Sequence, residues 1–113
     1  IIGLYDELQS SVLNQAYRSV ITKAKDIAEA LLPLKASVSP GRTFADTLQR
    51  VRKLIDSKQS DISLLTYHIC EKLRLLHQRT HPERAYEQPI APEVALAAAQ
   101  DLVEVLKEWG YAR

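Results

Sequence analysis

The most distinctive pair of residues in this 113-residue chain is an arginine and a histidine, Arg74 and His81, with six residues between them. The guanidinium of Arg74 stays charged, and its planar fork matches the oxygens of a phosphate group. The imidazole of His81 titrates near neutral pH, so it can accept or donate a proton. Together these residue types can hold a phosphate and move a proton beside it.

Further polar and basic side chains surround this pair, opposed by the acidic Glu71 and Glu83. We expect five of them to contact the same ligand: Lys72, His77, Gln78, Arg79 and Arg84. Of the two histidines, His77 is expected to matter less for proton transfer than His81, because the helix before Pro82 would aim it elsewhere. Basic residues at a helix C-terminus also interact favourably with the helix dipole, by about 0.3–1 kcal/mol, without any function.

Two other kinds of site would use residues of the same stretch. His77 and His81 have the spacing at which a helix can present two imidazoles to zinc, but no Glu or Cys stands where a third ligand is needed. Cys70 is the only cysteine and lies beside an apolar stripe. A nucleophilic thiol needs an activating base, so we expect a packed thiol instead. We therefore predict neither a metal nor a cofactor.

The composition is that of an ordinary globular protein, with 46% apolar residues, 26% charged residues and a net charge of +1. A net charge so small gives no overall attraction for nucleic acids or acidic membranes, so only a local basic patch could bind them. The single cysteine and the lack of a ~20-residue apolar run favour a cytoplasmic location without a membrane. Because the chain begins at Ile1 and lacks methionine, we interpret residues 1–113 as one domain cut from a longer polypeptide.

Apolar residues recur at steps of three and four in four segments, and this periodicity predicts four amphipathic helices. The first stripe runs through residues 8–31, and Pro33 is expected to end that helix, since an interior proline removes a donor and clashes with the preceding turn. Residues 35–41 are expected to form a loop. Thr43 is the expected start of the second helix. The second stripe consists of Phe44, Leu48, Val51, Leu54 and Ile55.

The third helix carries the arginine of the pair. Ser60 or Asp61 is its expected N-cap. Its apolar stripe consists of Ile62, Leu65, Ile69, Leu73 and Leu76. Pro82 disfavours the helical conformation at His81, so this helix is expected to stop near Thr80.

The fourth helix closes the chain after a polar connection over residues 82–91. Pro92 fits its first position, and Gly110 fits its end. Its stripe consists of Val94, Ala98, Leu102, Val105 and Trp109. No segment alternates as a strand would, so we predict an all-α fold, a bundle of four main helices.

A long helix, a second amphipathic helix, the sequence Leu-Arg-x6-His-Pro and an alanine-rich last helix resemble the HEPN superfamily of nucleotide-binding domains. The resemblance covers about residues 12–109. The family signature is an arginine followed after four to six residues by a histidine, and Arg74 with His81 fits its upper limit. The family often has Asn, Asp or His directly after the arginine, where this chain has Leu75. Gln78, one turn along, could supply that polar group.

The resemblance implies two kinds of activity. Active members form homodimers and cleave RNA without a metal. In that reaction His81 would remove the proton of a ribose 2′-OH or protonate the departing 5′ oxygen, while Arg74 would neutralise charge on the phosphate oxygens. The products would be a 2′,3′-cyclic phosphate and a 5′-hydroxyl.

Other members serve without catalysis as binding or dimerisation modules, such as the small helical domain of bacterial restriction and defence proteins. We expect this second role here, with RNA or a nucleotide as the ligand, and keep the toxin-like endoribonuclease as the alternative. A helicase or nuclease, either fused to this domain or acting as its partner, would favour the function of a binding module. A neighbouring nucleotidyltransferase would favour the ribonuclease function.

Overall fold

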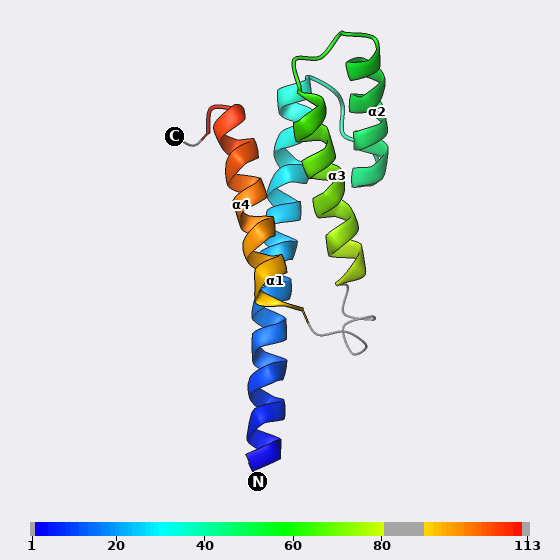
Figure 1. Cartoon of the computed structure of the whole chain (residues 1–113). Helices are drawn as coiled ribbons and strands as arrows, with labels where there is room; N and C mark the ends of the chain where they lie inside the picture. The colour runs from blue at the N-terminus through cyan, green and yellow to red at the C-terminus, as the bar shows by residue number, and fades with distance from the viewer. Residues whose placement is uncertain (1, 81–89, 112–113) are drawn as a thin grey trace.

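Each of the four expected stripes forms a helix. The structure is a computed structural model that describes the backbone of residues 2–80 and 90–111 and the side chains of residues 16–80 and 90–111. Its helices are α1 (Ile2–Ala36), α2 (Phe44–Asp56), α3 (Leu64–Arg79) and α4 (Pro92–Glu108) (Figure 1). The predicted all-α bundle of four helices is confirmed. None of these helices has a stretch long and apolar enough to cross a bilayer.

The long helix α1 is the support against which the other helices are arranged. Both α3 and α4 pack on α1, and α2 lies mainly against α3. α3 runs antiparallel to α1, and the N-terminal part of α1 extends beyond the other helices (Figure 1). At 1.5 Å per residue, the 35 residues of α1 span about 50 Å.

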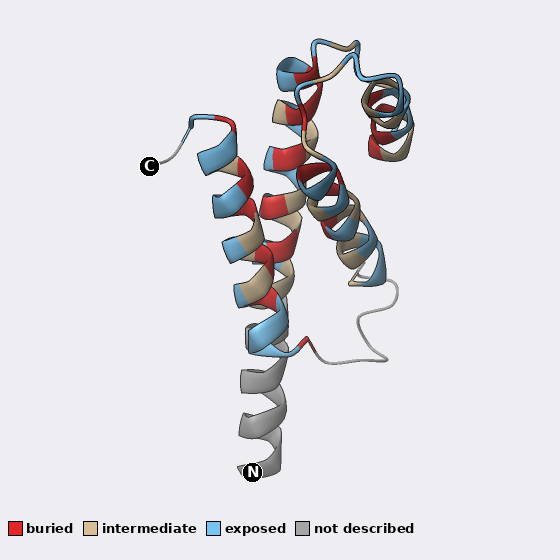
Figure 2. Ribbon diagram, turned by 45° about the horizontal axis from the view of Figure 1, so that its top comes forward, coloured by how far each residue is buried: buried red, intermediate tan, exposed pale blue. Residues whose placement is uncertain are grey.

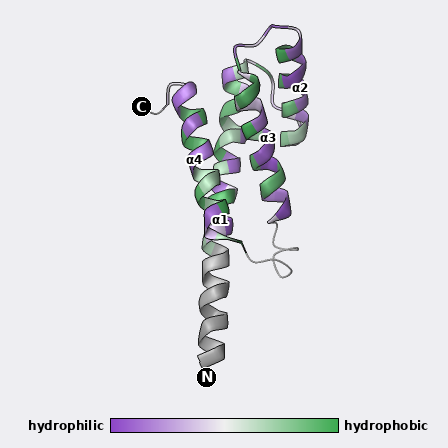
Figure 3. Cartoon of the chain, viewed as in Figure 1, coloured by the Kyte–Doolittle hydropathy of each residue, from purple (hydrophilic) through white to green (hydrophobic). Residues whose placement is uncertain are grey.

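The core lies where α1, α2, α3 and α4 face one another. Figure 2 shows the buried positions on the inward sides of the helices, and Figure 3 shows apolar residues on the same sides. The largest fully buried side chains are Ile21, Leu32, Leu73, Val51, Val105, Thr66 and Cys70. Burying an aliphatic side chain of this size contributes about 1.5–3 kcal/mol. The hydroxyls of Thr66 and Ser63 are hydrogen-bonded to each other at 3.0 Å, so the polar atom of Thr66 in the core has a partner.

Several predicted helix ends are confirmed. The hydroxyl of Thr43 accepts a hydrogen bond from the backbone N–H of Asp46 at 3.2 Å, as an N-cap does. Pro92 begins α4, and α3 ends at Arg79 with Thr80 as its C-cap. Gly110 has φ +84° just after α4, where a left-handed residue allows the last carbonyls of the helix to find donors.

The predicted end of α1 at Pro33 is wrong, because the helix continues for one more turn to Ala36. Pro33 removes one donor, but Leu32 and Ala36 on either side of it are buried in the core and hold this turn in place. The helix then stops at Ser37, whose φ is 55°. The N–H of Val38 donates to the carbonyl of Pro33 at 3.0 Å and closes the helix end.

The predicted N-cap of α3 is also wrong. Ser63 caps α3 by accepting from the N–H of Thr66 at 3.1 Å, whereas the Ser60 hydroxyl accepts from the N–H of Ile62. Ile62 and Tyr67 are both buried at the positions of a hydrophobic staple, which fixes the later start.

The buried faces of α3 and α4 differ in part from the predicted stripes. Leu65 is 71% exposed, and the buried residues of α3 are Thr66, Tyr67, Cys70 and Leu73. On α4, Ala95 is buried, whereas Val94 is 37% exposed. Each helix contacts more than one neighbour, so those contacts select its buried face.

Candidate functional site

Arg74 lies in an open pocket of about 410 Å³ between α1, the beginning of α2 and α3. The pocket is lined by Lys25, Glu29, Thr43, Phe44, Ala45, Arg74, His77 and Gln78. Three of these were predicted from the sequence, and they share one face of α3 because residues three and four apart on a helix are neighbours. The structure thus brings Arg74, His77 and Gln78 together.

The guanidinium of Arg74 has an unpaired donor. Its Nε is buried, and no residue in the described part of the chain accepts a hydrogen bond from it. A buried donor without an acceptor costs about 1–3 kcal/mol, and more if it is charged.

The beginning of α2 adds a second group of donors to the pocket. Phe44 and Ala45 occupy the first two positions of this 13-residue helix, where backbone N–H groups have no acceptor within the helix. The helix dipole also places partial positive charge there. Anions bind readily at helix N-termini for these two reasons.

The negative charge of Glu29 in the pocket is partly offset by Lys25. The ammonium of Lys25 lies 2.9 Å from the Glu29 carboxylate and 3.3 Å from that of Asp26. Burial by itself lowers the pKa of Lys25, but the hydrogen bonds and charges of Glu29 and Asp26 outweigh it, so the pKa is raised above 10.5. Lys25 therefore stays charged at neutral pH and shields a carboxylate that would repel an anion.

Lys72 and Arg79, both predicted to bind the ligand, lie on a different side of α3 from Arg74. They line a pocket of about 310 Å³ together with His68, Glu71, Leu75 and Leu76. Residues seven apart share a side of a helix, whereas residues two apart do not. The ammonium of Lys72 is also held by Asp101 of α4, at 3.1 Å. The predicted ligand-binding residues therefore fall into two groups.

Two predicted residues, His81 and Arg84, lie outside the described residues, so their roles stay predictions. His77 was predicted to contact the ligand, and it lines the pocket of Arg74. Lys25 was not predicted from the sequence to belong to the site. The sequence shows its i, i+4 spacing to Glu29, but only the packing of α1 against α3 brings the pair to this site.

The prediction that Cys70 is a packed thiol is confirmed. Its side chain is fully buried, and burial, followed by the charge of Glu108, raises its thiol pKa to about 12. A thiol that stays protonated is a poor nucleophile. No group of three His, Cys, Asp or Glu side chains that could hold a metal occurs in the described ranges.

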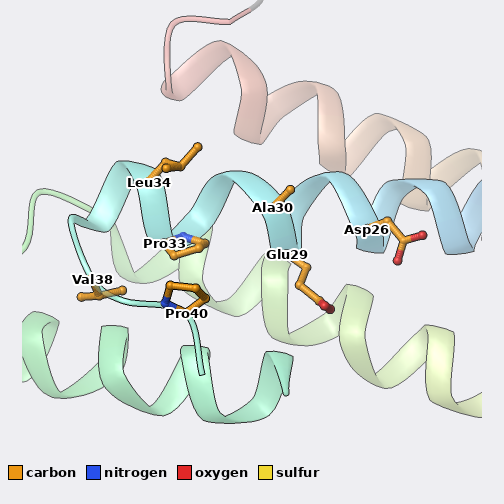
Figure 4. Close-up of a pocket in the computed structure, with 7 residues that line it drawn as sticks. All are labelled: Asp26, Glu29, Ala30, Pro33, Leu34, Val38 and Pro40. Carbon is orange, nitrogen blue, oxygen red and sulfur yellow. The ribbon is translucent and has the colours of Figure 1, made fainter. Parts of the chain in front are cut away.

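A larger pocket, of about 480 Å³, lies where α1 ends. It is lined by Asp26, Glu29, Ala30, Pro33, Leu34, Val38 and Pro40, and Figure 4 shows these side chains. Its charged lining residues are two acids, and the rest of its lining is apolar. This pocket does not suit a phosphate, and the Arg74 pocket is better matched to an anion.

No family model matches the sequence, and the comparisons with curated proteins and with solved structures also gave no match.

Proposed function

We propose that this chain is a HEPN-like helical domain that acts as a binding and dimerisation module of a larger defence or restriction-type protein. Its ligand is RNA, and a phosphate group of the RNA binds in the Arg74 pocket. The observation that carries this proposal is that Arg74 and the first two residues of α2 line one pocket.

A phosphate oxygen would accept hydrogen bonds from residues that line the pocket. Arg74 offers the planar N–H donors of its guanidinium group. The first backbone N–H groups of α2 offer further donors at the positive end of a helix dipole. Lys25 offsets part of the negative charge of Glu29, since its ammonium also faces Asp26. The positive charge of the site thus comes from local geometry, in a chain whose net charge is only +1.

The test compares two arginines of the same helix. Arg74→Gln should weaken binding of a fluorescent single-stranded RNA by about tenfold or more, since hydrogen bonds to charged groups contribute about 1.5–3 kcal/mol. Arg79→Gln, on the other side of α3, should change the affinity by no more than about twofold, as expected for an exposed charge. Circular dichroism should show unchanged helicity in both variants. Equal losses in the two variants, or no binding by the wild-type protein, would refute the proposal.

An exposed apolar row on α1 supports the dimerisation role. Val20, Ile27 and Leu34 stand at steps of seven and are 38%, 39% and 70% exposed. Such a spacing places them along one side of a helix, as in helices that pair along their length. We assign the homodimer contact to this row.

The alternative function, a metal-independent endoribonuclease, is favoured by one observation: His77 and Arg74 line the same pocket. In this reaction a ribose 2′-OH loses its proton to an imidazole and attacks the adjacent phosphorus. The bond from phosphorus to the 5′ oxygen breaks, and that oxygen takes up a proton from an imidazole. The products are a 2′,3′-cyclic phosphate and a 5′-hydroxyl.

A further inference from the structure

The exposed side of α1 has the residue spacing of a coiled-coil seam. Val20, Ile27 and Leu34 recur at steps of seven, and Lys23 and Ala30 follow the first two of them by three residues. All five residues are exposed, and together they are called the α1 seam. Alternating steps of three and four keep such residues on one side of a helix, where a second helix packs against them. Lys23 carries the one charge of the α1 seam.

Asp26 borders the α1 seam and shares its counter-charge with another carboxylate. Its carboxylate lies 3.3 Å from the ammonium of Lys25, and its side chain is 60% exposed. The same ammonium is closer to Glu29, at 2.9 Å. Asp26 also lines the pocket of about 480 Å³, together with Ala30 and Leu34 of the seam (Figure 4). One ammonium thus faces two carboxylates, and the pocket has room for the side chain of a further cation.

The charge of Lys23 decides the direction in which two copies can pair. In a parallel pair, equivalent positions of the two helices meet at the seam, so the two Lys23 ammonium groups would repel each other. An antiparallel pair can place Val20 of one copy opposite Ala30 of the other. Lys23, three residues further on, then faces Ile27, three residues before Ala30. Because Asp26 directly precedes Ile27, Lys23 comes to lie beside the Asp26 carboxylate of the second copy.

We propose that two copies of this chain pair in antiparallel orientation along the α1 seam, with Lys23 of each copy bound to Asp26 of the other. The contact is isologous, so the same ion pair forms twice around one two-fold axis. The apolar stem of Lys23 lies over Ala30 while its ammonium reaches the carboxylate. This inference rests on the dimerisation part of the proposed function, and it adds the direction, the register and the charge contact of the dimer.

The antiparallel pair leaves the Arg74 pocket accessible. Lys25, which lines that pocket, is two residues away from both Lys23 and Ile27. At 3.6 residues per turn, residues two apart point to nearly opposite sides of a helix. The second copy therefore covers the side of α1 opposite Lys25. RNA binding, tested by Arg74→Gln, does not depend on this pairing, so the two proposals can fail separately.

The test exchanges the two charges. Lys23→Glu would set two carboxylates against each other at both contacts, and Asp26→Lys would do the same with two ammonium groups. The dissociation constant of each variant dimer should rise by at least about tenfold, because like charges at an interface are strongly unfavourable. An equal mixture of the two variants should form a heterodimer of about twice the chain mass of 12.8 kDa, since each contact again joins a carboxylate to an ammonium. Sedimentation equilibrium measures both effects.

Lys53→Glu is the matched control, because Lys53 is an exposed cation on α2. It should dimerise like the wild-type protein, and circular dichroism should show unchanged helicity in every variant. If the mixture stays monomeric, or if Asp26→Lys dimerises like the wild-type protein, the antiparallel pairing is refuted, although a dimer that Ile27→Glu disrupts would still stand. A monomeric wild-type protein would refute both the pairing and the dimerisation role.

Discussion

The ammonium of Lys72 on α3 lies 3.1 Å from the carboxylate of Asp101 on α4. This ion pair joins two helices on a side of α3 that Arg74 does not share. It is partly open to solvent, with the Lys72 side chain 62% exposed. Lys72 therefore belongs to the contact between α3 and α4 and not to the Arg74 pocket.

From this relationship we expect Lys72→Gln to affect neither function nor fold strongly. The affinity for single-stranded RNA should change by no more than about twofold, and the free energy of unfolding should fall by about 0.2–1 kcal/mol, the usual contribution of an exposed pair. RNA titration and urea denaturation measure the two effects. A tenfold loss of affinity would place Lys72 in the binding site.

RNA cleavage assays distinguish the endoribonuclease function from the function of a non-catalytic binding module. If the chain is a ribonuclease, His81→Ala should lower the cleavage rate by about 100- to 10,000-fold, and a metal chelator should have no effect. Single-stranded DNA should not be cut, because it lacks the 2′-OH. His77→Ala belongs in the same experiment, since His77 lines the Arg74 pocket. Identical trace cleavage by the wild-type protein and all variants would identify a contaminant and leave the module as the function.

The buried thiol of Cys70 makes stability depend on pH in the alkaline range. Its pKa is raised from 9.0 to about 12 in the folded protein, so above pH 9 the unfolded chain loses this proton first. The contribution of the protonated Cys70 thiol to the free energy of unfolding is complete below pH 9. It is lost as the pH rises toward 12, at up to about 1.4 kcal/mol per pH unit. Urea denaturation should show a steeper alkaline loss for the wild-type protein than for Cys70→Ala. Equal pH profiles would contradict the shifted pKa.

The exposed row on α1 gives a test of the homodimer. Light scattering of the wild-type chain should give about twice its mass of 12.8 kDa. Ile27→Glu should produce a monomer with unchanged helicity, because it places a charge in the proposed contact. Val103→Glu is a control on α4, where the replaced side chain is 43% exposed. If both variants remain dimers, the contact lies elsewhere.

The sequence alone determined the helices and most of their ends. Periodicity predicts four helices because each must bury one apolar side, and the signals of Thr43, Pro92 and Gly110 act through their own local backbone. Pro33 shows the limit of such signals. The packing of Leu32 and Ala36 in the core extends α1 by one turn beyond the end that the proline predicts.

Only the tertiary structure decided which side of each helix faces the core and which polar residues meet. Leu65 is exposed and Thr66 buried because the neighbours of α3 select its buried face. For the same reason Arg74 shares a pocket with Lys25 from α1 and with the beginning of α2, while Lys72 turns toward α4. Spacing along the chain fixes which residues share one helix face. The identity of the element that this face meets depends on contacts between residues far apart in sequence.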